Sequence, residues 1–399
     1  MRILHTADWH IGCKSDDLSR LPEQIDICNQ IIKIADQKKV DMVIIAGDIY
    51  DMFIPSAEAE KLVFDTLIAL SNNGNRAVVA VAGNHDEPKR FSNANVFAKN
   101  FNIYLVGDLN RVEIAPLTNK NIVPVKSGAG YIEFNTKAGE NVVVGTLPYP
   151  SYYRFNEIKK AGENFDSKLK QWLEPCVSHF KKGSINILVS HLLTYPLNCS
   201  AEEYETYETL GGAISFVDRK NLITKADYTA LGHIHQKIAV DKENHIYYSS
   251  APINKFFNDD VYYENSVKIV DLKPGKGVVK IEDIKINTKQ LDTKEVSSIE
   301  EATEYLKVNP DVLIKLVFVN MDYVNPADIK ELRKNFPNLI TVSVMPKLGD
   351  KSFSEVTKKD LSTKEIFEKF IEYKTGEKPD KKLTELFLEL MGEITYETN

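Results

Sequence analysis

The sequence predicts a layered α/β fold, and three observations support this prediction. Continuous apolar runs of strand length recur through roughly the first two thirds of the chain, amphipathic helical patterns separate the first of them, and a short polar motif follows each run. An apolar run of this length is typical of a strand that is buried on both faces. Alternation of such strands with helices is typical of a sheet that is covered by helices.

The expected elements follow one another regularly. Strands are expected at residues 2–5, 42–45, 78–81, 185–189 and 228–231. The first helix is expected to carry its apolar residues at helical spacing, with Pro22 near its start, where proline is tolerated. These apolar residues are Leu21, Ile25, Cys28, Ile32 and Ala35. A second helix with the same spacing is expected after Pro55-Ser56, around residues 62–70.

The pattern restarts near residue 280. Strands at residues 312–319 and 340–344 and helices at 299–306 and 326–334 predict a small α+β domain without metal ligands. Residues 347–360 are polar and resemble a linker. Two amphipathic helices are expected in the tail, with a capping box of Ser362 and Glu365 before the first and a break at Gly376 and Pro379. We therefore predict three parts, at residues 1–278, 279–348 and 349–399.

Composition limits the class of protein. The chain has 399 residues and a formal net charge of −7, which by itself argues weakly against a nucleic-acid partner. The argument is weak because carboxylates at a metal site count as charge while the ions do not. The four cysteines have no CxxC spacing, so we expect buried, reduced thiols. No apolar run is long enough for a bilayer, and the first strand leads straight to Asp8, so we expect no cleaved leader and a cytoplasmic protein.

Five short motifs follow the expected strands in a fixed order. They are Asp8-Trp9-His10, Gly47-Asp48-Ile49-Tyr50-Asp51, Gly83-Asn84-His85-Asp86, Ser190-His191 and Gly232-His233-Ile234-His235. In open α/β sheets, ligands bind beyond the carboxyl ends of the strands, which is where every motif falls. The glycines of three motifs are expected to let the backbone turn sharply beside the bound ions.

The motifs supply enough ligands for two divalent cations. The predicted metal ligands are Asp8, His10, Asp48, Asn84, His191, His233 and His235. We expect Asp48 to bridge the two ions, since a carboxylate offers two oxygens. Mixed nitrogen and oxygen ligation suits manganese, iron or zinc better than calcium. Two ions about 3.5–4 Å apart can activate a water and clamp phosphate oxygens, so the motifs predict phosphoester hydrolysis.

Other residues near the motifs have less certain roles. His85 is the candidate general acid, and Asp51 and Asp86 are candidates for fixing imidazole tautomers. Lys89 and Arg90 either contact phosphate or lie in a solvated loop. Trp9 either packs on the first helix or contacts DNA. The aromatic and cationic cluster around Arg154 (Tyr149, Tyr152, Tyr153 and Arg154) could stack on unpaired bases, but a proline-bracketed turn is the better interpretation of its tyrosines.

Taken together, the ordered motifs resemble those of the calcineurin-like metallophosphoesterase superfamily. Within it, MRILHTADWHIG, GDIYD, VAGNHD, TLPYP, SHL and ALGHIHQ resemble the SbcD-type DNA repair nuclease family, over residues 1 to about 255. The resemblance implies a β-sandwich flanked by helices, and a manganese-dependent DNA nuclease with 3′→5′ exonuclease and structure-specific endonuclease activity. It also implies a homodimer that works with a coiled-coil ABC-type ATPase subunit, SbcC.

The resemblance bears on the remaining segments and on one departure. It implies that residues 279–348 are a capping domain and that the C-terminal helices dock the ATPase. Many archaeal and eukaryotic relatives have a phosphate-contacting histidine where this chain has Asp51, an aspartate that bacterial relatives often share. A catalytic role for Asp51 is therefore an open question.

Two other classes of function remain open. The first is another enzyme of the superfamily, such as a metallophosphatase, nucleotidase or nucleotide phosphodiesterase. Protein phosphatases usually have arginine after the second motif, where this chain has Met52. The second is a metal-loaded scaffold that positions an ATPase on DNA and cuts nothing. The complete set of predicted ligands favours an active enzyme.

Overall fold

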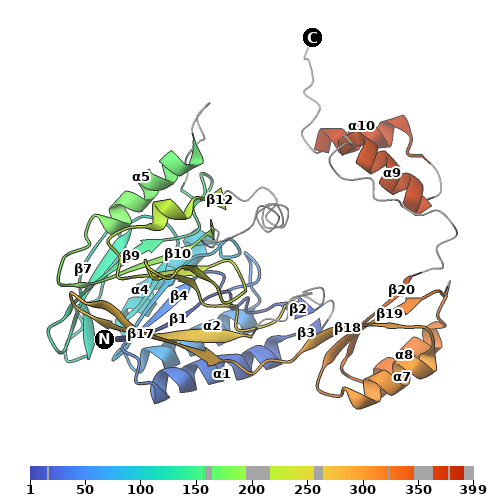
Figure 1. The fold of residues 1–399 in the computed structure, drawn as a ribbon, viewed down its shortest axis with the longest axis horizontal. Helices are drawn as coiled ribbons and strands as arrows, with labels where there is room; N and C mark the ends of the chain where they lie inside the picture. Colours follow the sequence, from blue (N-terminus) through green and yellow to red (C-terminus); the bar gives the residue numbers. More distant parts are fainter. Residues whose placement is uncertain are drawn as a thin grey trace, which may run out of the picture. The chain divides into compact units, whose positions relative to one another are not determined.

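The computed structural model describes residues 1–15, 18–155, 157, 164–194, 216–255, 264–321, 323–345, 363–375 and 378–390 (Figure 1). Contacts within the chain divide it into two units. The first contains Met1–Val319 and Tyr323–Val344, and the second contains Asn320–Asp322 and Met345–Asn399. The two units are described separately below.

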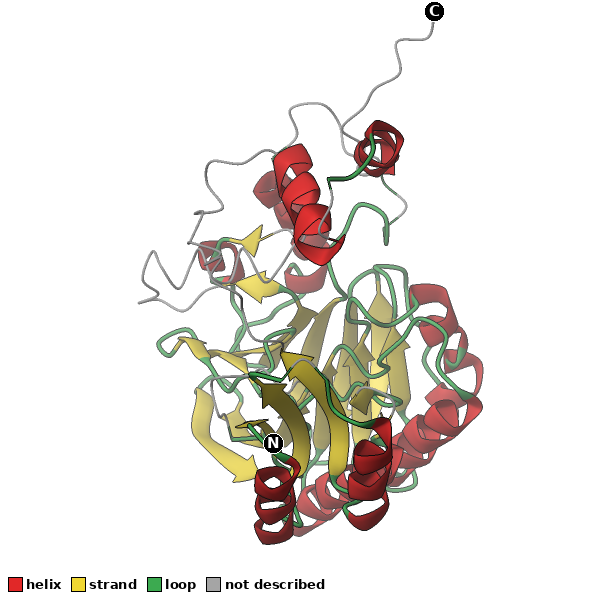
Figure 2. Ribbon diagram, turned by 90° about the vertical axis from the view of Figure 1, so that its right-hand side faces the viewer, coloured by secondary structure: helices red, strands yellow, loops and turns green. Residues whose placement is uncertain are grey.

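Two large sheets form the body of the first unit. The first sheet has the order β17 (Gly277–Lys285), β16 (Ser266–Lys273), β1 (Arg2–Thr6), β4 (Met42–Ala46), β5 (Ala77–Val81) and β6 (Ile103–Val106). The second has the order β14 (Ala239–Asp241), β15 (Ile246–Tyr248), β13 (Tyr228–Gly232), β10 (Ile185–His191), β9 (Asn141–Leu147), β8 (Tyr131–Thr136) and β7 (Ile122–Gly128). Figure 2 shows the strands gathered inside the body with helices along its outside.

Helices and short pairs of strands complete the body. The helices are α1 (Leu21–Gln37), α2 (Ala57–Ser71), α3 (Pro88–Asn93), α4 (Asn95–Ala98) and α5 (Phe165–Val177), and 3-10 turns lie at Lys99–Phe101 and Arg219–Leu222. The strands β2 (Lys14–Ser15) and β3 (Leu18–Ser19) pair, as do β11 (Leu193–Thr194) and β12 (Phe216–Val217). Pro22 lies in the first turn of α1, as the sequence predicts.

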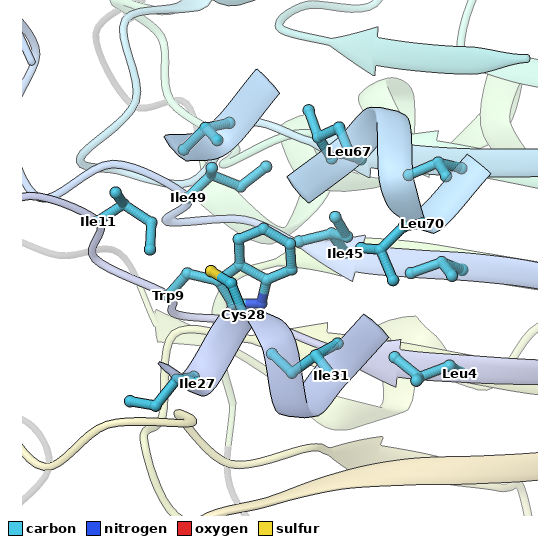
Figure 3. Close-up of a cluster of buried hydrophobic side chains, with 14 of the residues drawn as sticks. Leu4, Trp9, Ile11, Ile27, Cys28, Ile31, Ile45, Ile49, Leu67 and Leu70 are labelled. Carbon is cyan, nitrogen blue, oxygen red and sulfur yellow. The ribbon is translucent and has the colours of Figure 1, made fainter. Parts of the chain in front are cut away.

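Alternate residues of each central strand enter different cores. In the first sheet, Leu4 and Val43 pack with the helices α1 and α2, as Figure 3 shows for Leu4. Their neighbours Ile3 and Ile44 pack instead in the core that also holds Ile187 of the second sheet. The helix α5 covers the other face of the second sheet. The apolar runs are therefore continuous because each strand is buried on both sides, which confirms the α/β sandwich flanked by helices.

Parallel pairing brings the carboxyl ends of the central strands together. The strands β1, β4, β5 and β6 are parallel, as are β9, β10 and β13. All the expected strands of this body are confirmed, each within two residues at either end. The sequence did not predict the antiparallel neighbours β7, β8, β16 and β17. In β17 no residue is fully buried, so its sequence lacks a clear apolar pattern.

A third sheet lies near the end of the first unit. It contains β18 (Leu291–Val296), β19 (Leu313–Val319) and β20 (Leu339–Met345), with α7 (Ile299–Val308) and α8 (Pro326–Asn335) between its strands in the sequence. The two expected strands and two expected helices are confirmed, while β18 was not predicted. The contacts group nearly all of this segment with the body, so its independence as a domain stays a prediction.

The second unit contains the two helices of the tail. These are α9 (Thr363–Thr375) and α10 (Lys381–Leu390), and the rings of Phe367 and Phe387 stack with centroids 4.0 Å apart. The predicted capping residue Ser362 and the predicted linker lie outside the described residues. Within the part of the chain that is described, no helix has the length and apolar character needed to cross a membrane.

Candidate metal centre

The loops that follow the central strands run side by side. The backbone N–H of Asp8 donates to the carbonyl of Gly47 at 2.9 Å, and that of His10 donates to the carbonyl of Asp48 at 3.0 Å. These bonds join the ends of β1 and β4. The N–H of Tyr149 donates to the carbonyl of Ala82 at 2.9 Å, which joins the ends of β9 and β5 across the two sheets. The motifs of both sheets therefore meet in one place.

Four of the predicted ligand residues have a backbone conformation that ordinary side chains rarely adopt. The φ angles are 55° at Asp8, 45° at His10, 50° at Asp48 and 108° at His233. A positive φ costs free energy in residues other than glycine and is concentrated at functional sites. The strain turns these side chains toward a common centre.

The first group of converging side chains comprises Asp8, His10 and His235. One candidate ligand atom from each lies within 4.8 Å of the others. The Nε2 atoms of His10 and His235 are 3.1 Å apart. Two nitrogens bound to one metal through bonds of about 2.1 Å at near-right angles lie roughly 3 Å apart, so this spacing fits a shared cation.

The second group comprises Asp48, His191 and His233, again with ligand atoms within 4.8 Å of one another. The Oδ1 of Asn84 is 3.0 Å from Nε2 of His191 and 2.9 Å from Nδ1 of His233. The Oδ2 of Asp48 is 3.4 Å from Nε2 of His191 and 3.7 Å from Nε2 of His10. Asp48 thus lies between the two groups, where the sequence placed a bridging carboxylate.

A neighbouring acceptor fixes which nitrogen of His191 faces the centre. Nδ1 of His191 lies 2.8 Å from the carbonyl of Ala46, which can only accept, so this nitrogen donates. Its Nε2 then presents a lone pair to the centre. Nδ1 of His10 lies 3.3 Å from Oδ1 of Asp51, which is an ion-pair distance without hydrogen-bond geometry. Asp51 therefore lies beside the His10 ring, and its role in fixing the tautomer of that ring stays a prediction.

The electrostatics of the centre fit a cation. Asp8 is fully buried, and burial, together with the nearby Asp48, raises its pKa to about 8 although His191 opposes the shift. Burial lowers the pKa of His233 to about 3, so its ring is neutral and can coordinate. Burial opposes the shift, but His191 and His10 hold the pKa of Asp48 well below its usual range. Burial likewise opposes the shift at His191, yet Asp48 and Asp8 raise the pKa of that imidazole to about 9. In the protein alone this imidazolium supplies the positive charge beside the two carboxylates, and divalent ions would take its place. The residues present therefore fit the divalent metal ions that the motifs predict.

All three motif glycines are required by close contacts, and a Cβ on Gly232 would lie 1.9 Å from the carbonyl oxygen of Ala46. A Cβ on Gly83 would lie 2.1 Å from Oδ1 of Asp48 and 2.2 Å from its backbone nitrogen. A Cβ on Gly47 would lie 2.3 Å from Nδ1 of His191, and Gly47 also has a φ of 89°. Gly47 thus makes the predicted sharp turn. At Gly83 the φ is not positive, and glycine is needed there because the side chain of Asp48 packs against it.

His85 lies beside the first group and forms a third group with His10 and Asp51, whose candidate ligand atoms also lie within 4.8 Å of one another. Its ring is 4.8 Å from that of His10, and its Nδ1 donates to the carbonyl of Asp51 at 2.7 Å. The backbone N–H of His85 donates to Oδ1 of Asp48 at 2.8 Å. Nε2 is therefore the nitrogen of this ring that the bond to Asp51 leaves available. Lys255 lies outside the motifs and was not predicted, yet it forms a partly buried ion pair with Asp51.

Two further motif residues, Asp86 and Trp9, are buried and have structural roles. Asp86 is fully buried and accepts hydrogen bonds from the backbone N–H groups of Ile49, Tyr50 and Gly83. It holds two turns together and bonds to no histidine among the described residues, so the prediction that it fixes a tautomer is wrong. Trp9 is buried beside Cys28 and Ile31 (Figure 3), which confirms packing on the first helix.

The basic residues near the third motif differ in their surroundings. Lys89 and Arg90 are exposed at the start of α3, and Arg90 forms an ion pair with Glu60 at 2.7 Å. Arg154 is buried, and its Nη2 donates to the carbonyl of Asn84 at 2.7 Å. The ring of Tyr149 lies within 6.2 Å of those of His191 and His233. Tyr149 and Arg154 therefore line the centre, which sequence spacing alone did not establish.

Comparison with known proteins agrees with this geometry. Residues 1–237 match the family described as calcineurin-like phosphoesterase. The chain is 32% identical over 409 residues to the SbcD subunit of the nuclease SbcCD from Bacillus subtilis strain 168, covering 100% of this chain and 99% of that protein. It is 26% identical to the protein of the same name from Staphylococcus saprophyticus, over 86% of this chain and 84% of that one.

One solved structure is similar at a lower level. The crystal structure of TT1561 from Thermus thermophilus aligns with a TM-score of 0.34 and 11% identity, over 72% of this chain and 99% of that one. A score this low supports no conclusion by itself. The match over residues 1–237 and the full-length relatives suffice: the chain is a metal-dependent phosphoester hydrolase that belongs to the calcineurin-like phosphoesterase family and, within it, to the SbcD nucleases.

Proposed function

We propose that the chain is a dinuclear-metal phosphodiesterase that acts on DNA ends and hairpins, with 3′→5′ exonuclease and structure-specific endonuclease activity. The observation that carries this proposal is the position of Asp48 between two groups of converging ligands. Two adjacent cations are suited to hydrolysis of a phosphodiester. The names of the relatives, which are nuclease subunits, support a nucleic acid as the substrate.

The residues of the centre have distinct tasks in this proposal. Asp8, His10 and His235 would hold one ion, Asn84, His191 and His233 would hold the other, and Asp48 is placed to serve both. When bound, the two ions activate a water and neutralise phosphate charge. His85, with its Nδ1 held by the carbonyl of Asp51, delivers a proton from Nε2 to the leaving oxygen. Asp51 orients His10, and Lys255 balances the charge of Asp51.

Manganese is the metal we propose for both positions. The ligand set mixes imidazole nitrogens with carboxylate and amide oxygens, which manganese accepts more readily than magnesium does. The test is hydrolysis of a small phosphodiester after chelation and reloading with manganese, zinc or magnesium. Manganese should restore the highest rate, and restoration by magnesium alone would contradict the assignment.

The tail offers a docking surface for a partner. Phe370 of α9 and Leu383 of α10 are exposed, with 52% and 43% of their surface accessible. We propose that these helices bind a coiled-coil ABC-type ATPase of the SbcC kind, as the name SbcCD of the relatives suggests. Coexpression of the two chains should give a complex that Phe370→Asp with Leu383→Asp dissociates. Unchanged association would place the ATPase elsewhere.

A second copy of the chain is the other partner we propose. Five apolar side chains of α2, α4 and the following turn are exposed, and all except Val96 border an apolar cavity of about 330 Å³. The five are Phe64, Ile68, Val96, Phe97 and Phe101. An exposed apolar cluster of this kind is typical of an interface. Sedimentation should show a dimer that Phe97→Asp converts to a monomer, whereas a wild-type monomer would exclude the homodimer.

DNA cleavage itself decides between this function and its alternatives. Duplexes labelled at the 3′ or the 5′ end, a hairpin, a small phosphodiester and a phosphomonoester should be compared with manganese present. We expect loss of nucleotides from 3′ ends and cleavage at the hairpin. Hydrolysis of the monoester alone would favour a metallophosphatase, and hydrolysis of small diesters alone a nucleotide phosphodiesterase. No hydrolysis, with the ATPase bound, would favour a scaffold.

The cellular role follows from this chemistry. An enzyme that opens hairpins and trims ends serves DNA repair, recombination and replication, and we propose the cytoplasm as its location. Lys89 and Arg90 are the DNA contacts we propose beside the centre. Arg90 contributes less than Lys89, because Glu60 already neutralises it.

A further inference from the structure

Arg154 differs from the other buried arginines in lacking a carboxylate partner. Arg20 and Arg76 are 2% and 4% exposed, and each is paired with a carboxylate: Arg20 with Glu23 at 2.6 Å, and Arg76 with Asp36 at 2.9 Å. Arg154 is 7% exposed and forms no ion pair within the described ranges. Its charge is therefore buried without a direct counter-ion, which is costly in a protein unless a ligand supplies one.

Of the two terminal nitrogens of the Arg154 guanidinium, only Nη2 has a hydrogen-bond acceptor among the described residues. Nη2 donates to the carbonyl of Asn84 at 2.7 Å. Nη1 is buried and has no hydrogen-bond acceptor among the residues that the structure describes. A buried donor without an acceptor is rare in native proteins and calls for an explanation such as a missing ligand. Nη1, the donor without an acceptor, therefore belongs to the same side chain whose Nη2 holds the turn at Asn84 and His85 in place.

Two aromatic rings hold the guanidinium at the edge of the metal centre. The Cζ of Arg154 lies 5.4 Å from the ring centre of Tyr149 and 5.5 Å from that of Phe53. Tyr149 in turn borders His191 and His233, and Phe53 follows Asp51 by two residues. Cation–π contacts and the Asn84 carbonyl restrict the side chain before any substrate arrives. Phe53 is 44% exposed, so the ring that covers this side of the guanidinium lies at the protein surface.

We propose that Arg154 is a substrate-binding residue whose Nη1 donates a hydrogen bond to a non-bridging oxygen of the phosphodiester. The proposal rests on the phosphodiesterase function proposed above. A guanidinium is well suited to this task because it binds phosphate oxygens through directed, charge-assisted hydrogen bonds. The phosphate oxygen accepts the hydrogen bond that Nη1 lacks among the described residues, and its negative charge neutralises the buried guanidinium. Nη2 keeps its bond to Asn84, so the same side chain ties the phosphate to the turn that carries His85.

Binding of thymidine 5′-monophosphate tests this role apart from catalysis. The protein loaded with manganese is titrated with the nucleotide by calorimetry, for the wild type, Arg154→Met and Arg154→Lys. Methionine keeps an unbranched apolar stem between the two rings and removes the charge. A charge-assisted hydrogen bond contributes about 1.5–3 kcal/mol, so Arg154→Met should weaken binding by about tenfold to a hundredfold. Arg154→Lys should restore part of the affinity, since it keeps the charge but not the fork.

Kinetics and metal content separate substrate binding from a purely structural role. With the p-nitrophenyl ester of thymidine 5′-monophosphate, Arg154→Met should raise KM by a similar factor and lower kcat less, while manganese content stays unchanged. A lower kcat and lost manganese, with unchanged KM and nucleotide affinity, would show that Arg154 only supports Asn84 and would overturn the proposal. Nucleotide affinity within twofold of wild type would overturn it too.

Arg2→Met is the matched control for Arg154→Met. Arg2→Met removes a partly buried arginine at the opposite end of β1 and should leave KM and nucleotide affinity unchanged. If the wild-type protein binds the nucleotide through Arg154 but hydrolyses neither the ester nor DNA, the proposed nuclease function fails while the assignment of Arg154 as a phosphate-binding residue stands.

Discussion

The polar groups at the two ends of β1 have opposite surroundings. At the amino end every charge has a partner: Arg2 donates to Asp271 at 2.6 Å and 3.0 Å and to the carbonyl of Lys38 at 2.8 Å, while its backbone N–H donates to Asp41. At the carboxyl end, Asp8 and His10 face other acidic and imidazole groups on a strained backbone. The amino end stabilises the fold, and the carboxyl end gives up stability to hold ions.

The largest effect should come from a ligand at the carboxyl end. Asp8→Asn should lower the rate of diester hydrolysis by about 10⁴-fold or more, since an ion loses its carboxylate. In excess chelator the same change should leave the free energy of unfolding at neutral pH equal to or above that of wild type. Burial raises the pKa of Asp8 to about 8, so folding must either protonate this carboxyl or bury its charge, and asparagine avoids that cost. Activity assays and urea unfolding measure both. A variant that is markedly less stable without metal would contradict the contrast between the two ends.

His85 should affect the reaction without affecting the metals. His85→Gln removes the proposed proton donor and should lower kcat by about 10²- to 10⁴-fold. Manganese content, measured by elemental analysis, and the melting temperature should stay within error of wild type, since no ligand is lost. Release of metal from this variant would mean that His85 is a ligand and not the acid.

Asp86 should contribute to stability, as the residues at the amino end of β1 do, although it lies among the motifs. Asp86→Ala leaves three buried N–H groups without an acceptor, so it should lower the free energy of unfolding by about 3 kcal/mol. Asp86→Asn keeps one acceptor oxygen and should cost less. Chemical unfolding measures both variants. Equal stability of wild type and alanine variant would show that water replaces the carboxylate.

The smallest effect should come from the amino end itself. Arg2→Met should lower the free energy of unfolding by about 1 kcal/mol at neutral pH, because the pair with Asp271 is partly exposed. The hydrogen bond from Arg2 lowers the pKa of Asp271, so the pair stabilises the fold above the ordinary aspartate pKa and less as the pH falls below about 4. The difference between wild type and variant should therefore shrink as the pH falls through the lowered pKa of Asp271. A constant difference would mean that lost packing, not charge, explains the effect.

Much of this contrast could be predicted from the sequence. Apolar runs bounded by polar motifs identify parallel strands, and parallel strands bring their carboxyl ends to one edge. That reasoning placed Asp8, His10, Asp48 and the later histidines together without coordinates. The edge strands were harder to predict, since β17 carries exposed and half-buried residues along its length and has no clear period.

Roles that depend on the direction of a side chain could not be predicted. Asp51 and Asp86 both follow a strand within a polar motif, yet one faces His10 and the other three backbone N–H groups. Turn geometry decides between them, and spacing does not report it. The partners of Lys255 and Arg154 come from distant loops, so neither their pairing nor its absence has a local signature.

The assembly of the centre from both sheets has a consequence for synthesis. Its side chains extend from Asp8 to His235, and the two sheets that carry them share one core. A nascent chain that has left the ribosome only as far as β10 still lacks His233 and His235. The complete set of ligands can therefore assemble only after more than half of the polypeptide has been made and the sandwich has closed.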